Sequence, residues 1–576
     1  MKRYIFLCFF TCVFFISKAQ LQFSGNKKFT KADSLRGTLS IYRSCYDVLM
    51  YDLDIKVDID NKFISGSNTI KFLANQSFRT LQIDLFSNMK VEKVLFMEKE
   101  LFFSRLYNAV FITFPSDIPK ASTQTIKVVY SGNPQVAKNP PWDGGFSWTK
   151  DKEGNPFVGV SCQGTGASLW YPCKDHQSDE PNEMLIRVAV PDGFDEVSNG
   201  RLKRTVHLND GYTKFEWYVS NPINNYDVTI NIAKYKHFAC VYKNKNYKDS
   251  LTLDYYVIPS NFEKAEKQFE QVKPMLDAYY YYYGEYPFVK DGYKLVEAPY
   301  LGMEHQSCIA YGNKYKNGYL GFDMSGAGYK FDYIIIHESA HEWWGNSITT
   351  NDIADMWIHE GFGTYSEALY IEYLYGHDAY LEYINAEKKH LSNDVPIIGN
   401  YGVNSEGSGD MYPKGALLIH TIRSIIDDDK KFFQILSGIQ KKFQHQCVNS
   451  TEIENYFSEQ SEINLKPIFD LYLRNVPIPT LEVIIYRDFL DLKANYYFSF
   501  KNSRTNEKDK LLERSHFSMP VKITSEKNKY VNVFPDTDGQ QTINLKDMHP
   551  EDFKVATELF YIDSHIVIEK GAEEEH

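Results

Sequence analysis

Hydrophobic and polar positions alternate with a period of two along much of the first 259 residues. Between 52 and 59 every second side chain is aliphatic and the others are charged, which is typical of a strand with one wet face. A turn at 60–62 and a run at 63–72 then predict a hairpin. The same pattern predicts further strands at 81–85, 125–130, 184–190, 213–219 and 251–257. We therefore expect a β domain at the N-terminal end.

From residue 261 the apolar positions change to helical spacing. Phe262, Ala265, Phe269 and Val272 lie three or four residues apart, so they share one helix face. Similar patterns predict helices at 333–344, 356–375, 415–426 and 451–458. Thr451 and Glu454 have the spacing of a capping box at the start of the last helix. A second, helix-rich domain over residues 260–475 follows from this change of period.

The pattern changes again at the Val-Pro-Ile-Pro segment 476–479. Strand-like runs follow at 481–486, 496–501, 521–523 and 530–534. An acidic turn at 536–539 lacks the further oxygen ligands of a calcium loop, which favours a plain turn. We predict a separate C-terminal β-sandwich over residues 476–576.

The first nineteen residues have the pattern of a secretory signal peptide. Lys2 and Arg3 precede an apolar run at 4–16, and Ser17 and Ala19 suit cleavage after residue 19. A retained anchor is the alternative, but the run is shorter than the roughly 20 residues that span a bilayer. No later run is long and apolar enough for a transmembrane helix. We therefore expect an exported protein, periplasmic or secreted, with its N-terminal β domain at 20–259.

Charge and cysteine content narrow the class of protein. The chain has 63 basic and 75 acidic residues, a net charge of −12, and no basic run, which disfavours nucleic-acid binding. Six scattered cysteines follow the signal peptide, and none forms a Cys-x-x-Cys pair. One or two disulfides and buried free thiols are both compatible with this spacing.

The strongest chemical signal is His337-Glu338-Ser339-Ala340-His341 within an apolar helical pattern. Four helical residues advance about 400°, so the two imidazoles stand on one face and can bind the same zinc ion. Glu338 points to a different position, where a general base can act on a water at the metal.

A third ligand follows at a defined interval. Glu360 comes after eighteen intervening residues, on a second predicted helix. One carboxylate completes a site of two histidines and one glutamate that holds one zinc ion per chain and keeps a fourth position open. The alternative for Glu360 alone is a solvated surface carboxylate.

These motifs resemble those of the M1 aminopeptidases, the family of aminopeptidase N and leukotriene A4 hydrolase. The family pattern W-x-N-E-G-F-x-x-Y-x-E is matched by Trp357, Glu360, Gly361, Phe362, Tyr365 and Glu367. The segment 301–305 is similar to the exopeptidase signature G-x-M-E-N, and 412–416 to the Y-x-K-G segment. Matches at 46–53 and 171–175 extend the resemblance over the mature chain to about residue 474.

The resemblance implies a multidomain α+β fold. It comprises an N-terminal β-saddle domain, a thermolysin-like α/β zinc catalytic domain and a C-terminal β-sandwich of immunoglobulin-like type. The implied activity is hydrolysis of the N-terminal peptide bond of peptides. In that reaction Glu338 activates the water at the zinc ion, and Tyr412 donates its phenol to the oxyanion.

The resemblance also implies an anchor for the substrate amine. Glu304, within Gly302-Met303-Glu304, binds the free α-ammonium, so that only the first peptide bond reaches the metal. Gln163 lies where relatives place a second amine-binding residue. A surface glutamate and a simple glycine-rich turn are the alternatives for these two positions.

This chain departs from the family pattern at four places. Leu301 and His305 replace Gly and Asn of the exopeptidase signature, and His359 replaces the Asn before the zinc glutamate. The large C-terminal helical domain of many relatives has no counterpart here, so we hypothesise a more open cleft that admits longer peptides.

Two alternatives to an aminopeptidase remain at this point. A thermolysin-like endopeptidase has a similar zinc helix, but Gly302-Met303-Glu304 argues against it. A non-catalytic, zinc-containing peptide-binding protein would not need Glu338 and Tyr412 beside all three ligands. The expected partners are peptides with a free N-terminus.

Overall fold

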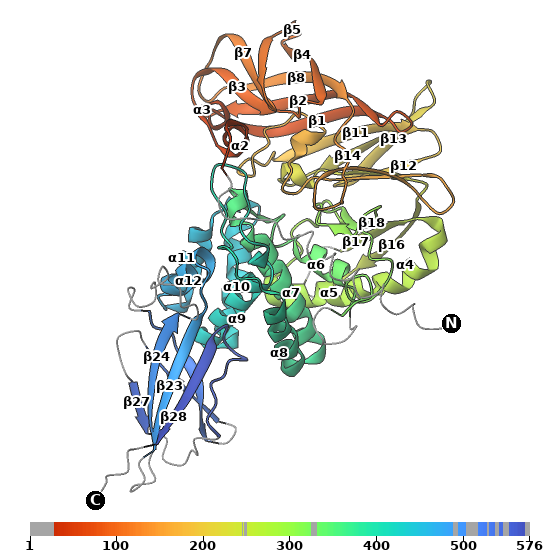
Figure 1. Cartoon of the computed structure of the whole chain (residues 1–576). Helices are drawn as coiled ribbons and strands as arrows, with labels where there is room; N and C mark the ends of the chain where they lie inside the picture. Colours follow the sequence, from red (N-terminus) through yellow and green to blue (C-terminus); the bar gives the residue numbers. More distant parts are fainter. Residues whose placement is uncertain are drawn as a thin grey trace, which may run out of the picture.

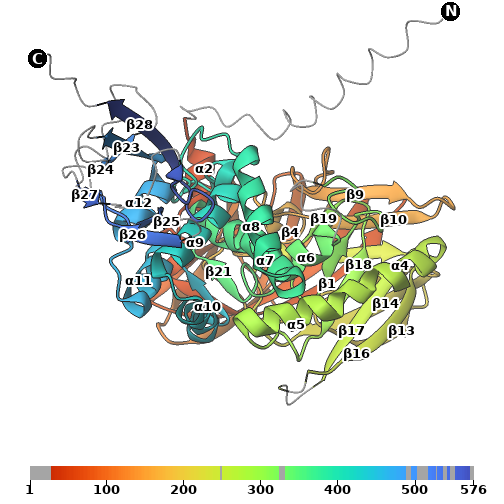
Figure 2. The ribbon, with the colours of Figure 1, turned by 90° about the horizontal axis from the view of Figure 1, so that it is seen from below.

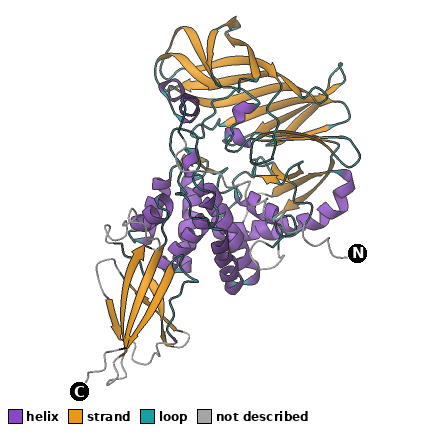
Figure 3. Ribbon diagram, in the orientation of Figure 1, coloured by secondary structure: helices purple, strands orange, loops and turns teal. Residues whose placement is uncertain are grey.

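The computed structural model has two β-rich parts with a helical part between them (Figures 1 and 3). It describes residues 28–244, 246, 250–323, 331–487, 494–502, 517–526, 529–535, 541–544 and 552–570. The predicted signal peptide and the predicted turn at 536–539 lie outside the described residues. Among the helices that are described, none is long and apolar enough to cross a membrane.

The N-terminal part is built on an eight-stranded sheet. Its strand order is β13-β14-β11-β1-β2-β8-β4-β5. The strands are β1 (Tyr46–Asp58), β2 (Phe63–Ala74), β4 (Met89–Phe96), β5 (Lys99–Glu100), β8 (Thr123–Gly132), β11 (Glu183–Pro191), β13 (Arg201–His207) and β14 (Tyr212–Val219). Two short helices, α2 (Lys31–Gly37) and α3 (Ile41–Ser44), precede the sheet.

Two smaller sheets complete this part. One has the order β3-β7-β6 and the other β12-β15-β10-β9. Their strands are β3 (Phe78–Asp84), β6 (Phe102–Leu106), β7 (Ala109–Ile118), β9 (Gly145–Lys150), β10 (Pro156–Ser161), β12 (Asp195–Ser198) and β15 (Ile230–Ala233). The loop after β10 carries Gln163, one of the predicted site residues.

The period-two pattern of the sequence is realised in the central sheet. In β1 the aliphatic Leu53, Ile55 and Val57 are almost completely buried, and the charged residues between them are half-buried. Each aliphatic residue therefore faces the core while its neighbours meet solvent. The strands predicted at 52–59 and 63–72 are confirmed as β1 and β2.

A five-stranded sheet joins the N-terminal part to the helices. Its order is β16-β17-β18-β20-β19, with β16 (Lys236–Tyr242), β17 (Leu251–Val257), β18 (Tyr293–Glu297), β19 (Gly302–Met303) and β20 (Ile309–Tyr311). Alternate residues of β18 and β20 enter two different hydrophobic cores, that of the N-terminal strands and that of the helices. β16 and β17 precede the predicted boundary at residue 259, so this sheet crosses it.

Helices make up the next part of the chain. They are α4 (Phe262–Gln268), α5 (Val272–Tyr283), α6 (Tyr333–Ala340), α7 (Trp357–Tyr375), α8 (His377–Ala386), α9 (Pro413–Ile426), α10 (Asp429–Phe443), α11 (Ser450–Ser461) and α12 (Lys466–Arg474). Figure 2 shows α4 and α5 along the sheet, where Phe269 packs on Tyr255 of β17 at 5.2 Å between ring centroids.

Two local predictions about the helices are wrong. The zinc helix was predicted to reach residue 344, but α6 ends at Ala340, and the following residues form turns. The capping box lies at Asn449 and Glu452 instead of Thr451 and Glu454. Asn449 is extended and accepts from the Glu452 amide, so the helix begins at Ser450 and Thr451 lies inside its first turn.

The C-terminal part is β-rich where it is described. β23 (Pro479–Arg487), β24 (Ala494–Asn502), β27 (Gln541–Asn544) and β28 (Asp563–Lys570) form a sheet of order β27-β24-β23-β28. β25 (Val521–Glu526) and β26 (Lys529–Val533) form a hairpin. A sandwich of two packed sheets stays a prediction.

This part is joined to the helices through a shared core. Tyr561 donates its backbone N–H to Thr421 of α9, at 2.9 Å, and its carbonyl accepts from the Tyr472 hydroxyl of α12, at 2.6 Å. Phe560, Tyr561 and Ile562 belong to the same hydrophobic cluster as buried residues of α9 and α12. The two parts are therefore packed on one another.

Candidate metal centre and active site

Helix α6 is positioned by its N-terminal cap. Asp332 accepts hydrogen bonds from the amides of Ile334 and Ile335, at 3.1 and 3.4 Å, and so satisfies two N–H groups of the first turn. The following isoleucines are buried, which places the helix inside the core. His337 lies on α6, and His341 is its C-cap residue, still in right-handed helical conformation.

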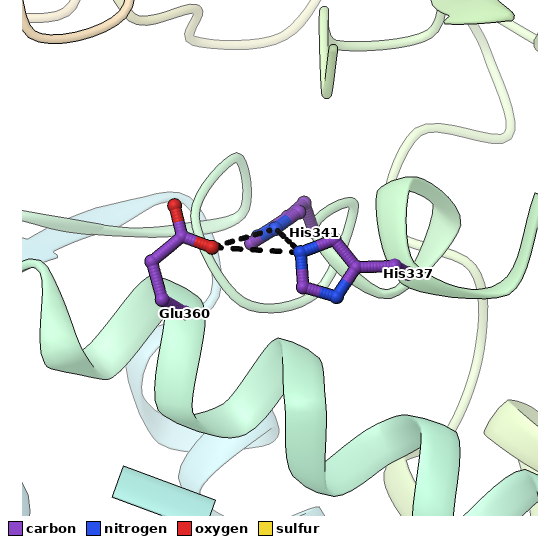
Figure 4. Close-up of side chains that lie close together, drawn as sticks. All are labelled: His337, His341 and Glu360. Atoms are coloured by element: carbon purple, nitrogen blue, oxygen red, sulfur yellow. Dashed lines mark hydrogen bonds and ion pairs between the residues drawn. The ribbon is translucent and has the colours of Figure 1, made fainter. Parts of the chain in front are cut away.

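The three predicted metal ligands converge (Figure 4). The Nε2 atoms of His337 and His341 are 3.2 Å apart, and Oε2 of Glu360 lies 3.5 and 3.4 Å from them. All three side chains are buried, and Oε2 has no hydrogen-bond partner among the described residues. Two imidazole nitrogens and one carboxylate oxygen around one point fit the donor set of zinc.

Helix α7 brings Glu360 to the histidines. Trp344, after α6, stacks on Phe362 of α7 with 3.9 Å between centroids and 9° between planes. Gly363 lies one turn after Glu360, and a Cβ there would stand 3.1 Å from Cε1 of His341 and 3.3 Å from Cε1 of His337. The absence of a side chain at this position lets both imidazoles lie against the helix.

Each imidazole has a partner on the side away from Glu360. Nδ1 of His337 lies 2.7 Å from Oε1 of Glu367, and Nδ1 of His341 lies 2.9 Å from the carbonyl oxygen of Trp344. These acceptors keep the proton on Nδ1, which leaves Nε2 free to bind a metal. Tyr383 of α8 donates its hydroxyl to the other oxygen of Glu367.

Glu338 lies beside this centre and under the strand β19. A Cβ on Gly302 would stand 2.8 Å from Oε1 of Glu338, so the backbone passes close to the carboxylate only because residue 302 is a glycine. Burial raises the pKa of Glu338 to about 8. A cation held by the three ligands would lower that pKa, because it favours the ionised carboxylate.

Met303 and Glu304 occupy different surroundings. Met303 is buried in the hydrophobic core of the N-terminal strands, so its side chain serves packing. Glu304 is also buried, but its Oε1 accepts from Nε2 of Gln163 at 2.6 Å. The same Nε2 donates to Oε1 of Glu360 at 3.0 Å. Gln163 thus connects the predicted amine anchor to a predicted metal ligand.

Two further contacts hold Glu304 in place. The Tyr226 hydroxyl donates to its Oε1 at 3.3 Å, and Asn346 donates from Nδ2 to its backbone carbonyl at 2.8 Å. Asn346 follows the zinc helix, so the position of the anchor depends on the same segment that carries the histidines. Burial raises the pKa of Glu304.

Tyr412 faces the metal centre from the start of α9. Its ring lies 6.0 Å from that of His337 with 24° between the planes. Among the described residues its hydroxyl has no hydrogen-bond partner. Burial, followed by the charges of Glu360 and nearby carboxylates, raises the pKa of Tyr412 well above its usual range. The phenol is therefore a neutral donor.

Comparison with known proteins gives the family. The model of the peptidase M1 N-terminal domain matches residues 48–226, and that of the peptidase family M1 domain matches residues 262–472. The chain belongs to peptidase family M1. The two matched domains correspond to the β-rich N-terminal part and the helical part that carries the site.

Curated M1 relatives are distant in sequence. Glutamyl aminopeptidase of Sus scrofa is 22% identical over 390 residues, which cover 64% of this chain and 40% of the relative. Tricorn protease-interacting factor F2 of Thermoplasma acidophilum is 22% identical over 59% of this chain and 43% of its own length. The chain therefore spans less than half the length of these relatives.

Solved M1 structures share the fold. An M1 zinc metallopeptidase of Deinococcus radiodurans superimposes with a TM-score of 0.61 at 20% identity, covering 75% of this chain and 94% of the other. A variant of that enzyme with a Tyr-Ser-Ala substrate gives a TM-score of 0.62 over 76% and 95% of the two chains. At this identity the likeness supports the fold alone.

Two of the departures from the M1 motifs are buried histidines. Burial lowers the pKa of both His305 and His359 to about 3, so both rings are neutral. Neither ring nitrogen of His305 has a partner among the described residues. His359 accepts at Nε2 from the amide of Thr350, at 3.0 Å, in the short strand β21 (Ile348–Thr350).

Sequence reasoning did not assign three residues of this M1 site. Tyr226 and Tyr383 belong to no motif, and only the fold brings them to Glu304 and Glu367. Glu406 lies in the loop before α9, with its carboxylate close to Gly164, and its burial raises its pKa to about 7. Glu367 was named only as part of the M1 pattern, although its place seven positions after Glu360, on the same helix face, could have indicated a role beside the ligands.

Proposed function

We propose that this protein is a zinc aminopeptidase that hydrolyses the N-terminal peptide bond of peptides. One observation carries the proposal: a buried carboxylate, Glu304, is connected through Gln163 to the convergent ligands His337, His341 and Glu360. A negative charge set beside a metal centre suits a substrate whose ammonium lies one residue from the reacting bond. Membership of family M1 supports the same chemistry.

The three ligands would hold the zinc ion. When bound there, zinc would supply a Lewis acid that lowers the pKa of a water molecule toward neutrality and polarises a carbonyl group. The acceptors on both Nδ1 atoms orient the rings so that both Nε2 atoms face Oε2 of Glu360.

Glu338 acts as general base and then as general acid. A cation held by the three ligands would favour its ionised form, and the ionised carboxylate is the form that can accept a proton. It takes a proton from the attacking water and passes it to the leaving amine. Proton transfer by a positioned carboxylate contributes about 10²- to 10⁴-fold to the rate.

Tyr412 and Glu304 supply the remaining contacts. The neutral Tyr412 phenol, which has no hydrogen-bond partner in the described part of the chain, donates to the developing oxyanion, a contact worth about 10²- to 10³-fold. Glu304 binds the α-ammonium and so excludes peptides with a blocked N-terminus. Gln163 holds the anchor, and the backbone at Gly302 and Met303 forms the wall beside the substrate.

The proposal extends to location and architecture. We infer export from the signal-peptide pattern of residues 1–19, and a C-terminal β-sandwich from the strand pattern after residue 479. One zinc ion per chain follows from the single set of two histidines and one glutamate.

The experiment is a panel of aminoacyl chromogenic substrates with their N-acetylated counterparts. The zinc-loaded protein is expected to release the chromophore only from free-amine substrates and to lose activity with a chelator. Glu338→Gln should reduce turnover by about 10²- to 10⁴-fold while zinc remains bound. Cleavage of the acetylated substrates would instead identify an endopeptidase, and a zinc-loaded protein without turnover would identify a peptide-binding protein.

A further inference from the structure

His359 has a defined tautomer because of a backbone hydrogen bond. The Thr350 amide lies 3.0 Å from its Nε2, and a backbone N–H can only donate. Nε2 therefore carries no proton, and the neutral ring has its proton on Nδ1. His359 is completely buried, so no solvent competes for that proton.

This tautomer gives direction to the contacts that end on Glu304. Nδ1 of His359 lies 3.5 Å from the Tyr226 hydroxyl, which in turn lies 3.3 Å from Oε1 of Glu304. Since Nδ1 must donate, the Tyr226 oxygen accepts there and its own proton is directed to Glu304. A series of three hydrogen bonds thus leads from the Thr350 amide through His359 and Tyr226 to the carboxylate of Glu304.

Only one oxygen of the anchor is held in this way. Oε1 of Glu304 accepts from both Tyr226 and Gln163, whereas Oε2 takes no hydrogen bond from the described residues. Two donors on one oxygen fix the rotation of the carboxylate and leave the other oxygen for a ligand. An ammonium group has the charge and the donors that this oxygen requires.

We propose that His359 and Tyr226 are positioning residues for recognition of the substrate's free amine. This inference rests on the proposed aminopeptidase function and adds a role for a residue that differs from the M1 pattern. Asn, which the pattern has at this position, has too short a side chain to reach both Thr350 and Tyr226 as an imidazole does. Here the Tyr226 hydroxyl is oriented by His359, which lies in the first turn of α7.

The first test measures ligand affinity apart from turnover. In zinc-loaded Glu338→Gln, calorimetry gives the Kd of an unblocked dipeptide with and without the additional change Tyr226→Phe. Loss of one hydrogen bond to the charged anchor should weaken binding about five- to tenfold. Zinc content should stay the same, because within the described structure the Tyr226 hydroxyl bonds to Glu304 and His359 and to none of the three proposed ligands. In the otherwise native enzyme the same change should raise KM and leave kcat within about twofold.

A matched control uses another buried tyrosine of the same neighbourhood. The Tyr171 hydroxyl donates to the carbonyl of Asn225, next to Tyr226, at 3.1 Å. Tyr171→Phe removes a buried hydroxyl and a nearby hydrogen bond without touching Glu304. Its Kd and KM should equal those of the parent protein. An equal loss in both variants would show that the effect is general loosening, which would overturn the inference.

The second test asks whether His359 acts through Tyr226. His359→Phe keeps the ring volume but removes both nitrogens, and it should weaken dipeptide binding about as much as Tyr226→Phe. The double variant should bind the dipeptide no more weakly than Tyr226→Phe alone, because both changes interrupt the same series of hydrogen bonds. The inference would be overturned if the affinity losses of the two single variants multiplied in the double variant, or if Tyr226→Phe bound the dipeptide with unchanged affinity. If the His359 variant does not fold, Tyr226→Phe and its control still decide.

These outcomes are separable from failure of the proposed function. A native enzyme that does not distinguish free from acetylated peptides refutes the aminopeptidase assignment itself. A native enzyme that does distinguish them, with unchanged Kd in both Tyr226→Phe and His359→Phe, refutes only the role of these two residues.

Discussion

At the scale of single residues, the side chains of the candidate metal centre are oriented by hydrogen bonds on the side away from the ligand atoms. Glu367 contacts Nδ1 of His337 at 2.7 Å, and Tyr383 contacts the far oxygen of Glu367. A carboxylate in this place sets the ring orientation and raises the basicity of the ligand nitrogen. The affinity for zinc therefore depends on residues that do not touch the metal.

We expect Glu367→Gln to weaken zinc binding about 10- to 100-fold, because a neutral amide supports the imidazole less well than a carboxylate. Competition with a fluorescent chelator measures the Kd. Glu382→Gln, on an exposed position of α8, is the control and should bind zinc like the native protein. Equal zinc affinities in Glu367→Gln and the native protein would contradict this role.

A second residue-scale prediction concerns acid stability. His420 is buried, and its ring lies 2.7 Å from the Tyr380 hydroxyl and 2.9 Å from the carbonyl of Glu558. Burial lowers its pKa to about 3, whereas the unfolded chain titrates near 6.5. Between these values the unfolded state binds more protons, so the free energy of unfolding falls as the pH is lowered through 6.5.

His420→Gln should remove this contribution, since the amide can accept from Tyr380 and donate to Glu558 without titrating. Over the unit below pH 6.5 the native protein should lose about 1 kcal/mol more stability than the variant. Urea denaturation at pH 7 and pH 5.5 measures the difference. The exposed His207 provides the control His207→Gln, which should keep the native slope. An unchanged slope in His420→Gln would count against the buried neutral ring.

At the scale of elements, two glycines on packed helices have separate tasks. A Cβ at Gly363 of α7 would meet the imidazoles of His337 and His341 at 3.1–3.3 Å, whereas a Cβ at Gly415 of α9 would stand 2.7 Å from Cα of Gly361. A side chain at Gly363 would disturb the two imidazoles, whereas a side chain at Gly415 would push α7 and α9 apart. The two positions therefore separate metal binding from helix packing.

We expect Gly363→Ala to weaken zinc binding about tenfold or more, because the methyl group displaces the rings, while the apo protein unfolds at nearly the native temperature. Alanine favours the helix by about 1 kcal/mol, which offsets part of the strain. Gly415→Ala should show the opposite result, with a lower Tm and zinc affinity retained. Titration with zinc and thermal unfolding by circular dichroism measure both. Identical behaviour of the two variants would refute the separation.

Individual helices and strands could be predicted from the sequence better than the way in which distant segments pair with one another. Periodicity found β1, in which buried positions alternate, and the apolar run at 356–375 found α7, whose residues 357–371 are all buried. It placed β17 with the N-terminal strands, because nothing local shows that this strand pairs with β18 across a helical segment. The same holds at the site. Spacing identified His337, His341 and Glu360, whereas Tyr226 reaches His359 across 133 residues of sequence.

At the scale of the whole molecule, the site is assembled from more than one part. The N-terminal part supplies Gln163 and Tyr226, the segment after β19 supplies Glu304, and the helical part supplies His337, His341 and Glu360. Strands β18 and β20 contribute to the cores on both sides, so these parts cannot shift independently without exposing apolar surface. The distance between amine anchor and metal is thus a property of the fold.

Because this packing does not depend on the ion, we expect removal of zinc to abolish activity while the protein stays folded. Trp344 stacks on Phe362 next to the ligands, and the helices around them are buried in one continuous core. A chelator should leave the far-ultraviolet circular dichroism spectrum unchanged, and added zinc should restore turnover. Zinc at 100 times its Kd should stabilise the native state by about 2.7 kcal/mol and raise the Tm by a few degrees. Loss of the helical signal on chelation would instead mean that the metal, and not the core, holds α6 and α7 together.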